Sequence, residues 1–404
     1  MTNPLSGFSR VLSLLRWDQA GEAALAALSS HQWSQLVAQL ARPRLLGLLG
    51  RRLDLTGGRV IPPPDSAAQI RAATRTGLRR HLAAAQPVIA CLAETGITAM
   101  LLKGGDLAQR CYGNIGQRAM IDLDLLVRPE HVAALDAALR RRGYHSRFTA
   151  DAVRLPTEHH LSYQPPPGAR TVEIHWRLSR RVDKGIVLDD IWRRSQPTAF
   201  FGTPVRVMAP EDLVPYLCAH LAHHLYFTSL NQIWDLAELA RLSATGFDDA
   251  ACRQRTQAWG LTPMMDLARA VLDATLGVVL IPDGPRTSVP GPVRETALAE
   301  LARHFDGLPP SVGDGRGMDV LAGDQPLSAR FGLVWRSVVP PPAELAARFG
   351  HTAQPAATIR GYFRLWRHLI ASRGPQLRRW LGRDPDFRQA LKRMADLRRW
   401  LDGF

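Results

Sequence analysis

The chain has 404 residues and carries 51 Lys and Arg against 36 Asp and Glu, a formal net charge of +15. At roughly 150 residues per domain, this length predicts two or three domains. Hydrophobic residues make up 46% of the chain, which excludes collagen-like and low-complexity proteins and predicts a real core. The four cysteines lie far apart without a CxxC pair, so we expect neither a disulfide framework nor a cysteine zinc site.

Charge interrupts the apolar stretches of the sequence. Glu94 follows the run VIACLA and Asp273 lies inside LARAVLDATLGVVLI, so neither stretch reaches the roughly 18 residues of a membrane span. The N-terminal segment has only a short apolar stretch with an acidic residue soon after it, unlike a signal peptide or an anchor. We therefore expect no membrane span and a reducing, cytoplasmic location.

The first 92 residues follow a helical pattern. Apolar residues recur at i, i+3, i+4 and i+7 within 23–28, 33–49 and 70–92, and Pro62-Pro63-Pro64 predicts a loop before the last of these. The pattern then changes to short runs with strand character: 97–102, 121–127, 159–164 and 171–176. Pro129 begins a predicted helix that ends at Gly143.

Helices return from Pro210 onward, and Pro and Gly become frequent from residue 281, where we expect irregular connections around short helices. The overall pattern predicts an α+β protein in which a small mixed sheet is flanked by helical segments. We expect four parts: a helical N-terminal domain over 1–92, a catalytic core over 93–208, a helical segment closing the cleft over 209–280, and a Pro/Gly-rich connection with basic C-terminal helices over 281–404.

Asp122 and Asp124 form the sharpest chemical signal. Residues i and i+2 of a strand project to the same face, so two carboxylates meet on a strand whose other members are apolar. Burying two like charges is costly unless a cation lies between them, and Mg²⁺ prefers such oxygen ligands. The alternative is an exposed edge strand. Because removing one crowded carboxylate relieves repulsion, either Asp→Asn change is expected to leave the metal-free fold at least as stable.

Lys103-Gly104-Gly105 follows a predicted buried strand and precedes an apparent helix that starts near Asp106. Two glycines let the backbone approach a ligand, and the start of a helix offers free N–H groups to phosphate oxygens. The segment lacks the GxxxxGK[ST] pattern of a Walker A loop. The alternative is an ordinary turn from strand to helix.

Glu173, His175 and Arg177 share one face of a predicted strand, opposite an apolar face. This polar row is either a solvated sheet face or the floor of a polar cleft. The pattern alone does not choose between the two.

Three segments resemble the uncharacterised nucleotidyltransferase-like family of the DNA polymerase β superfamily: LLKGGDLAQRCYGNIGQRAMIDLDLLVRPEHVAALDAALRRRGY, TVEIHWRL and LCAHLAHHLYFTSLNQIWDLAEL. The specific part is the combination of Lys-Gly-Gly, an arginine four residues before DxD, and Glu-x-His-Trp. Members of this family are bacterial, and some are encoded beside genes for lasso peptides and other peptide modifications.

The resemblance implies a glycine turn at Gly104 and Gly105, metal-binding aspartates at Asp122 and Asp124, and a third carboxylate at Glu173. It implies a Mg²⁺- or Mn²⁺-dependent enzyme that transfers a nucleoside monophosphate from an NTP such as ATP and releases pyrophosphate. One metal ion would bind the triphosphate, and the other would activate an acceptor hydroxyl. Glu173 is either a ligand of that second ion or the general base.

Further residues are expected to bind the nucleotide. Lys103 and Arg118 would neutralise charge on the phosphates, and His175 would line the same site; for Arg118 the alternative is a structural ion pair. The helical histidines His220, His223 and His224 are open to three interpretations: a packed pair, a pocket lining, or a zinc site with Asp235 as the nearest further ligand.

The acceptor is the open part of this prediction: a peptide, a protein, a small molecule or RNA. Residues 351–404 are rich in Arg with interleaved aromatic residues, which suits weak, non-specific polyanion binding or a packed helix pair with a solvated basic face. The alternative functions are a non-catalytic nucleotide-sensing or RNA-binding protein on the same fold, and an RNA-directed nucleotidyltransferase.

Overall fold

A computed structural model of the chain describes these residues: 5–154, 158–178, 185–242, 246–281, 288–312, 335, 338–342, 345, 355–382 and 384–403. Much of the predicted Pro/Gly-rich connection lies outside the described residues, as does Arg383 of the basic C-terminal segment.

A mixed sheet lies at the centre of the fold and confirms the α+β class. Its strands are β1 (Met100–Leu101), β2 (Asp122–Leu126), β3 (His145–Ser146), β4 (His160–Gln164), β5 (Thr171–His175), β6 (Gln196–Phe200) and β7 (Thr203–Val207). Among the described residues, the strand order in this seven-stranded sheet is β3-β4-β5-β2-β1-β7-β6. The pairs β2–β5 and β1–β7 are parallel, whereas the other neighbours are antiparallel.

Helices precede, connect and follow the strands. Those before the sheet are α1 (Leu5–Leu15), α2 (Gln19–Ala26), α3 (Ser30–Ala41), α4 (Leu46–Leu55) and α5 (Pro64–Thr95). Those between strands are α6 (Lys103–Cys111), α7 (Val132–Arg141) and α8 (Leu188–Arg194), with 3₁₀ turns at Ile115–Gln117, Pro129–His131 and Ala150–Arg154. Those after the sheet are α9 (Pro210–His223), α10 (Leu230–Leu242), α11 (Asp249–Ala258), α12 (Thr262–Leu276), α13 (Gly291–Phe305), α16 (Pro355–Leu381) and α17 (Pro385–Leu401).

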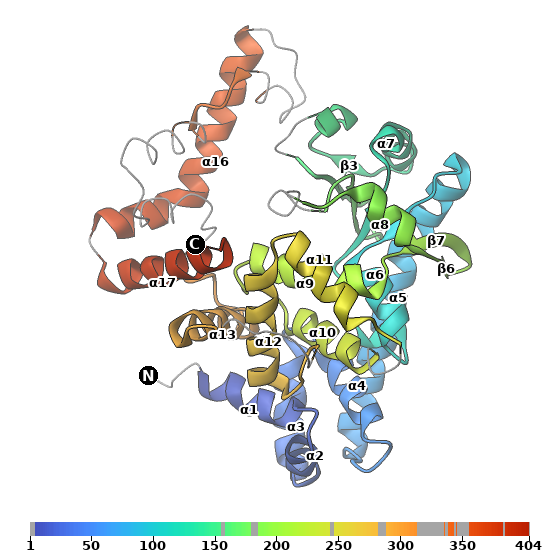
Figure 1. Cartoon of the computed structure of the whole chain (residues 1–404), viewed down its shortest axis with the longest axis vertical. Helices are drawn as coiled ribbons and strands as arrows, with labels where there is room; N and C mark the ends of the chain where they lie inside the picture. Colours follow the sequence, from blue (N-terminus) through green and yellow to red (C-terminus); the bar gives the residue numbers. More distant parts are fainter. Residues whose placement is uncertain are drawn as a thin grey trace.

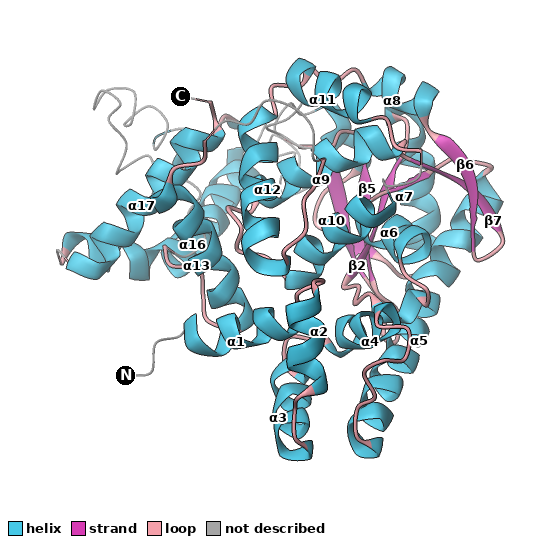
Figure 2. Cartoon of the chain, turned by 60° about the horizontal axis from the view of Figure 1, so that its bottom comes forward, coloured by secondary structure: helices cyan, strands magenta, loops and turns pink. Residues whose placement is uncertain are grey.

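The two faces of the sheet pack against different helices. On β2, Leu123 and Leu125 belong to a core formed with the C-terminal half of α5 and with α7, while Leu126 belongs to a second core with α9 and α10. Figure 2 shows α6, α9 and α10 on one side of β2 and β5. Because side chains alternate along a strand, Asp122 and Asp124 lie on the α9 side with Leu126.

The N-terminal helices share that second core with the helices after the sheet. α1 contacts α12 and α13, and the Trp17 ring lies 5.2 Å from that of Trp234 on α10. In Figure 1 the first helices therefore lie beside α12 and α13, far from them in sequence. The predicted boundaries at residues 92, 208 and 280 stay predictions.

The observed elements differ from the expected ones in three places. The predicted helix near Asp106 begins at Lys103, so Gly104 and Gly105 lie in its first turn. The hairpin β6–β7 was not predicted, and α13 is a helix of 15 residues in a region where only short helices with irregular connections were expected. No helix within the described ranges combines the length and apolar character that a membrane crossing requires.

The two C-terminal helices differ in packing. α17 packs on α13 with Phe387 and Trp400 buried, whereas α16 contacts few other elements and leaves Phe363 69% and Ile370 72% exposed. Figure 1 shows α16 extending away from the rest of the described chain.

Candidate active site

Three carboxylates converge where β2 and β5 lie side by side. Asp122 and Asp124 share one face of β2, and the parallel register places Asp124 opposite Glu173. A carboxylate oxygen of Asp124, one of Glu173 and a ring nitrogen of His175 all lie within 4.8 Å of one another. The sequence places the two aspartates on one face, and the strand pairing adds Glu173.

Asp124 is the centre of this cluster and is 3% exposed. The Lys103 ammonium lies 2.9 Å from its Oδ1, and the His175 Nε2–H donates a hydrogen bond of 3.1 Å to the same oxygen. Burial would raise the pKa of Asp124, but these two partners lower it well below its usual value. Asp124 is therefore ionised in the absence of a metal, with Lys103 as its counter-ion.

Asp122 differs from its neighbour because it forms no ion pair among the described residues. Burial, together with the nearby charge of Asp124, raises the pKa of Asp122 to about 6. An additional cation between the two carboxylates would relieve both effects. In this cluster Asp124 has a paired cation, Lys103, whereas Asp122 has no cation paired with it in the part of the chain that the structure describes.

Glu173 and His175 on β5 complete the polar cluster around Asp124. The His175 Nε2 lies 3.4 Å from Glu173 Oε2, and the His160 Nε2 lies 3.8 Å from Oε1. Burial would raise the pKa of Glu173, but the contact with His175 lowers it below its usual value. Burial would lower the pKa of His175, but hydrogen bonds to Asp124 and Glu173 raise it. Glu173 and His175 are therefore largely buried, which does not fit a solvated sheet face.

The start of α6 lies beside Asp124. The Leu102 N–H donates to the Asp124 carbonyl at 3.0 Å, and the helix begins at the next residue without a side-chain cap. Lys103 has a φ of +42°, an uncommon conformation for a residue with a Cβ. An uncapped helix start has free N–H groups and the positive end of the helix dipole, both of which favour a phosphate.

The two glycines allow α6 to approach the sheet closely. A Cβ on Gly105 would lie 3.0 Å from Leu123 Cδ1, and one on Gly104 would lie 2.9 Å from Arg118 Nη1. A larger residue at either position would have to displace one of these two side chains. The glycines therefore have a packing role in addition to the phosphate contact expected from the sequence.

Arg118 is engaged in a buried ion pair. Its Nε donates to Asp235 Oδ1 at 2.9 Å and its Nη2 to Oδ2 at 2.7 Å, and its Nη1 donates to the Ala119 carbonyl. The Tyr112 hydroxyl donates to Asp235 as well, at 2.8 Å. The guanidinium thus faces α10, and its Nη1 end lies beside Gly104.

α9 adds Tyr216, which was not considered from the sequence, and His220, for which a pocket lining was one of three interpretations. Tyr216 and His220 are close enough to Lys103 and Asp124 to interact with their charges. Burial raises the pKa of Tyr216 and lowers that of His220 well below its usual value. The Tyr216 hydroxyl is buried without a hydrogen-bond partner among the described residues. The i, i+4 spacing of Tyr216 and His220 on a helix was the available signal.

The helical histidines do not form a metal cluster among the residues that the structure describes. The His220 and His224 rings pack edge to face with centroids 4.7 Å apart, and those of His223 and His224 lie 5.3 Å apart. Asp235, the further ligand considered for zinc, is bound by Arg118.

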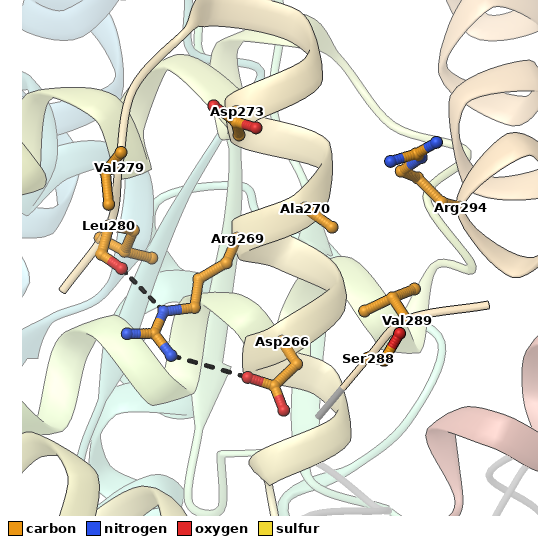
Figure 3. A pocket seen from close by; sticks show the side chains of 9 residues that line it. All are labelled: Asp266, Arg269, Ala270, Asp273, Val279, Leu280, Ser288, Val289 and Arg294. Carbon is orange, nitrogen blue, oxygen red and sulfur yellow. Dashed lines mark hydrogen bonds and ion pairs between the residues drawn. The ribbon is translucent and has the colours of Figure 1, made fainter. Parts of the chain in front are cut away.

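A pocket of about 330 Å³ lies elsewhere, beside α12 (Figure 3). Arg269 crosses it, donates to the Leu280 carbonyl at 2.8 Å and pairs with Asp266. This pocket shares no residue with the carboxylate cluster. Arg269 and Asp266 of this pocket are already paired with each other, so the chemistry favours the cluster on β2 and β5.

Comparison with known proteins gives one family. A family model described as an uncharacterised nucleotidyltransferase matches residues 29–277, which is more than half of the chain and includes the whole site described above. No curated protein and no solved structure matches the sequence.

Proposed function

The chain belongs to this uncharacterised nucleotidyltransferase family, and we propose that it transfers a nucleoside monophosphate from an NTP to an acceptor and releases pyrophosphate. The observation that carries this proposal is the convergence of Asp122, Asp124 and Glu173 beside the uncapped start of α6. Carboxylates hold the cation that a triphosphate needs, and helix N–H groups bind its phosphate oxygens.

The residues fit a divalent metal ion. Asp122 lacks an ion-pair partner among the described residues, and the lysine and histidine partners of Asp124 both contact Oδ1, which leaves its second oxygen for a metal ion. We propose that the two aspartates hold Mg²⁺ or Mn²⁺, with Glu173 as a further ligand on the acceptor side. When bound, the metal ions would neutralise the triphosphate and lower the pKa of the acceptor hydroxyl.

The protein residues then have distinct roles in our proposal. The Lys103 ammonium leaves Asp124 and neutralises phosphate charge, while the N–H groups of the first turn of α6 hold the phosphates. His175 donates to Asp124 and fixes its orientation. Arg118 acts indirectly, because its donors bind Asp235 and Ala119. Its Nη1 packs beside Gly104 and so helps to position the start of α6.

In the reaction, an acceptor oxygen attacks the α-phosphorus in line and the bond to pyrophosphate breaks. The proton of the acceptor hydroxyl passes to solvent water, and the pyrophosphate leaves as an anion whose charge a bound metal ion would neutralise. Glu173 has a pKa below its usual value, which favours a ligand role over that of a proton acceptor.

Thermal unfolding with a panel of NTPs tests nucleotide binding. A ligand present at 100 times its Kd stabilises the native state by about 2.7 kcal/mol, so NTP with Mg²⁺ should raise the melting temperature. Asp122→Asn should abolish that shift, whereas Asp151→Asn, at an exposed position of a 3₁₀ turn, should preserve it. No shift with any NTP and Mg²⁺ or Mn²⁺ would refute nucleotide binding.

Release of pyrophosphate, measured with each NTP in the presence of hydroxyl-bearing peptides and small molecules, tests catalysis. Binding without metal-dependent pyrophosphate release from any acceptor would instead support a nucleotide sensor. We propose that the acceptor is a peptide, a protein or a small molecule.

RNA binding over a salt series tests the acceptor class. The exposed Arg360, Arg364 and Arg367 of α16 should give only weak binding, lost by about 0.15 M salt. Sub-micromolar RNA binding that survives physiological salt and weakens on Arg→Gln substitution would favour an RNA acceptor.

A further inference from the structure

Three imidazoles meet at the edge of the carboxylate cluster. His159 precedes β4, His160 is its first residue, and the antiparallel register pairs His160 with His175 at the end of β5. One ring nitrogen from each histidine lies within 4.8 Å of the other two. The rings of His160 and His175 are stacked with centroids 4.9 Å apart, and those of His159 and His160 pack edge to face at 4.2 Å.

His160 and His175 both direct Nε2 towards Glu173, at 3.8 and 3.4 Å. The His160 Nδ1 lies 2.9 Å from the His159 Nε2, and the buried His175 Nδ1 has no hydrogen-bond partner among the described residues. An unpaired nitrogen in a residue that is 2% exposed has a cost unless it binds something.

The geometry suits a transition metal ion with nitrogen ligands. Tetrahedral Zn²⁺ with Zn–N bonds of about 2.0–2.1 Å places its ligand nitrogens about 3.3 Å apart. His159 Nε2 and His160 Nδ1 are close to this spacing at 2.9 Å, and the ligand nitrogen of His175 lies within 4.8 Å of both rings' nitrogens.

We propose that His159, His160 and His175 form a second metal site, which binds a transition metal ion such as Zn²⁺ beside the carboxylate site. Imidazole nitrogen suits Zn²⁺ and its neighbours in the first transition series, whereas Mg²⁺ requires oxygen. His159 and His160 are partly exposed, which gives an ion access from solvent. A water molecule would complete the coordination, as in sites with three protein ligands.

The second site is linked to the first through His175. Its Nε2–H donates to Asp124, so binding of a metal at Nδ1 would create the carboxylate–histidine–metal arrangement that fixes a ring and its tautomer. Asp124 would then support one metal site from the second shell while it binds the other directly. Occupancy of the histidine site would thereby hold Asp124 in place for the nucleotide site.

Titration of the chelator-treated full chain with Co²⁺ and then Zn²⁺, without nucleotide, tests the proposal. The visible absorption of Co²⁺ reports nitrogen coordination, and Zn²⁺ should displace it. His159→Gln and His160→Gln should each weaken Zn²⁺ binding by at least about tenfold. Asp122→Asn and the exposed control His145→Gln should each change it by less than about threefold.

Two outcomes would overturn the proposal. Zn²⁺ binding that is unchanged in both His159→Gln and His160→Gln would place the ion elsewhere. Equal loss in Asp122→Asn would show that Zn²⁺ occupies the carboxylates. The melting-temperature shift with NTP and Mg²⁺ should persist in His159→Gln, because His159 is not among the residues that we assign to the nucleotide site; circular dichroism establishes that each variant is folded. A failure of NTP binding in the wild type leaves the zinc test unaffected.

Discussion

Asp124 and Asp235 are both buried aspartates paired with a cation, but they are satisfied in different ways. Arg118 binds both oxygens of Asp235 from two nitrogens, and the Tyr112 hydroxyl adds a third donor. Asp124 has one ammonium and one imidazole, both on Oδ1, and two more carboxylates share its strand pair.

The difference separates a structural pair from a binding site. A planar guanidinium that binds both carboxylate oxygens leaves no position for a ligand. Removal of one partner leaves the other as a buried charge without a counter-ion. A lysine is a flexible point charge that can exchange one anion for another. Excess negative charge around Asp124 therefore marks a place for a further cation, whereas the charges around Asp235 are balanced.

The largest effect should come from breaking the closed pair. Asp235→Asn leaves Arg118 buried and without a carboxylate, and we expect a loss of about 3–5 kcal/mol in the free energy of unfolding. Chemical denaturation measures it. A loss below about 1 kcal/mol would show that Asp235 does not hold Arg118 in place, and would again favour the predicted role of Arg118 in phosphate binding.

A smaller effect should separate the two aspartates of the DxD motif. Asp124→Asn removes the partner of Lys103 and should cost about 1–3 kcal/mol, because a buried ammonium is left without a carboxylate. Asp122→Asn should be as stable as the wild type or up to about 1 kcal/mol more stable, since it relieves repulsion. Both should abolish pyrophosphate release.

The structure thus predicts different outcomes for Asp122→Asn and Asp124→Asn, whereas the sequence alone predicted the same outcome for both. Equal destabilisation of both variants in denaturant titrations would mean that Asp122 also has a structural partner.

Lys103→Met tests whether Lys103 takes the place of a metal ion. Without the ammonium, Mn²⁺ alone should bind the nucleotide-free protein about tenfold more tightly, or about 1.4 kcal/mol, because no cation must be displaced. NTP binding should weaken in the same variant, because Lys103 no longer neutralises phosphate. Calorimetry measures both affinities, and a change of the same sign in the two would contradict the exchange.

The smallest effect concerns pH. The folded pKa of Asp122 is about 6 against an ordinary value of 3.8, so the native state binds this proton more tightly than the unfolded state does. The wild type should therefore gain stability from this group as the pH falls from 7 to 4, and Asp122→Asn should not. The stability advantage of the variant, on the order of 1 kcal/mol at pH 7 for this partly exposed group, should shrink over that range.

Local patterns predicted the α+β class and the single face of Asp122 and Asp124, because alternation along a strand is a property of neighbouring residues. The position of Glu173 opposite Asp124 depends on pairing between strands far apart in sequence. The partner of Arg118 lies on α10, more than a hundred residues away. Contacts between residues so far apart leave no periodic pattern in the sequence. The sequence therefore offered a structural ion pair of Arg118 only as an alternative to phosphate binding.

The hairpin β6–β7 was missed for a different reason. Its turn, Phe201-Gly202, has positive φ at both positions, as tight two-residue hairpins require. Such turns usually have the sequence Asn-Gly or Asp-Gly. With phenylalanine at the first turn position, the sequence pattern did not predict a hairpin. Tyr216 was missed because it lies in an apolar helix, where an aromatic residue predicts core packing.

The register between β2 and β5 determines how the site can change over generations. A shift of one residue in this pairing would set an apolar residue, Val172 or Ile174, against Asp124, and the carboxylate cluster would vanish although every residue remained. Insertions and deletions between the strands are absorbed by loops, but one inside either strand is not. The site therefore depends on the register of β2 and β5 as well as on the identity of its residues.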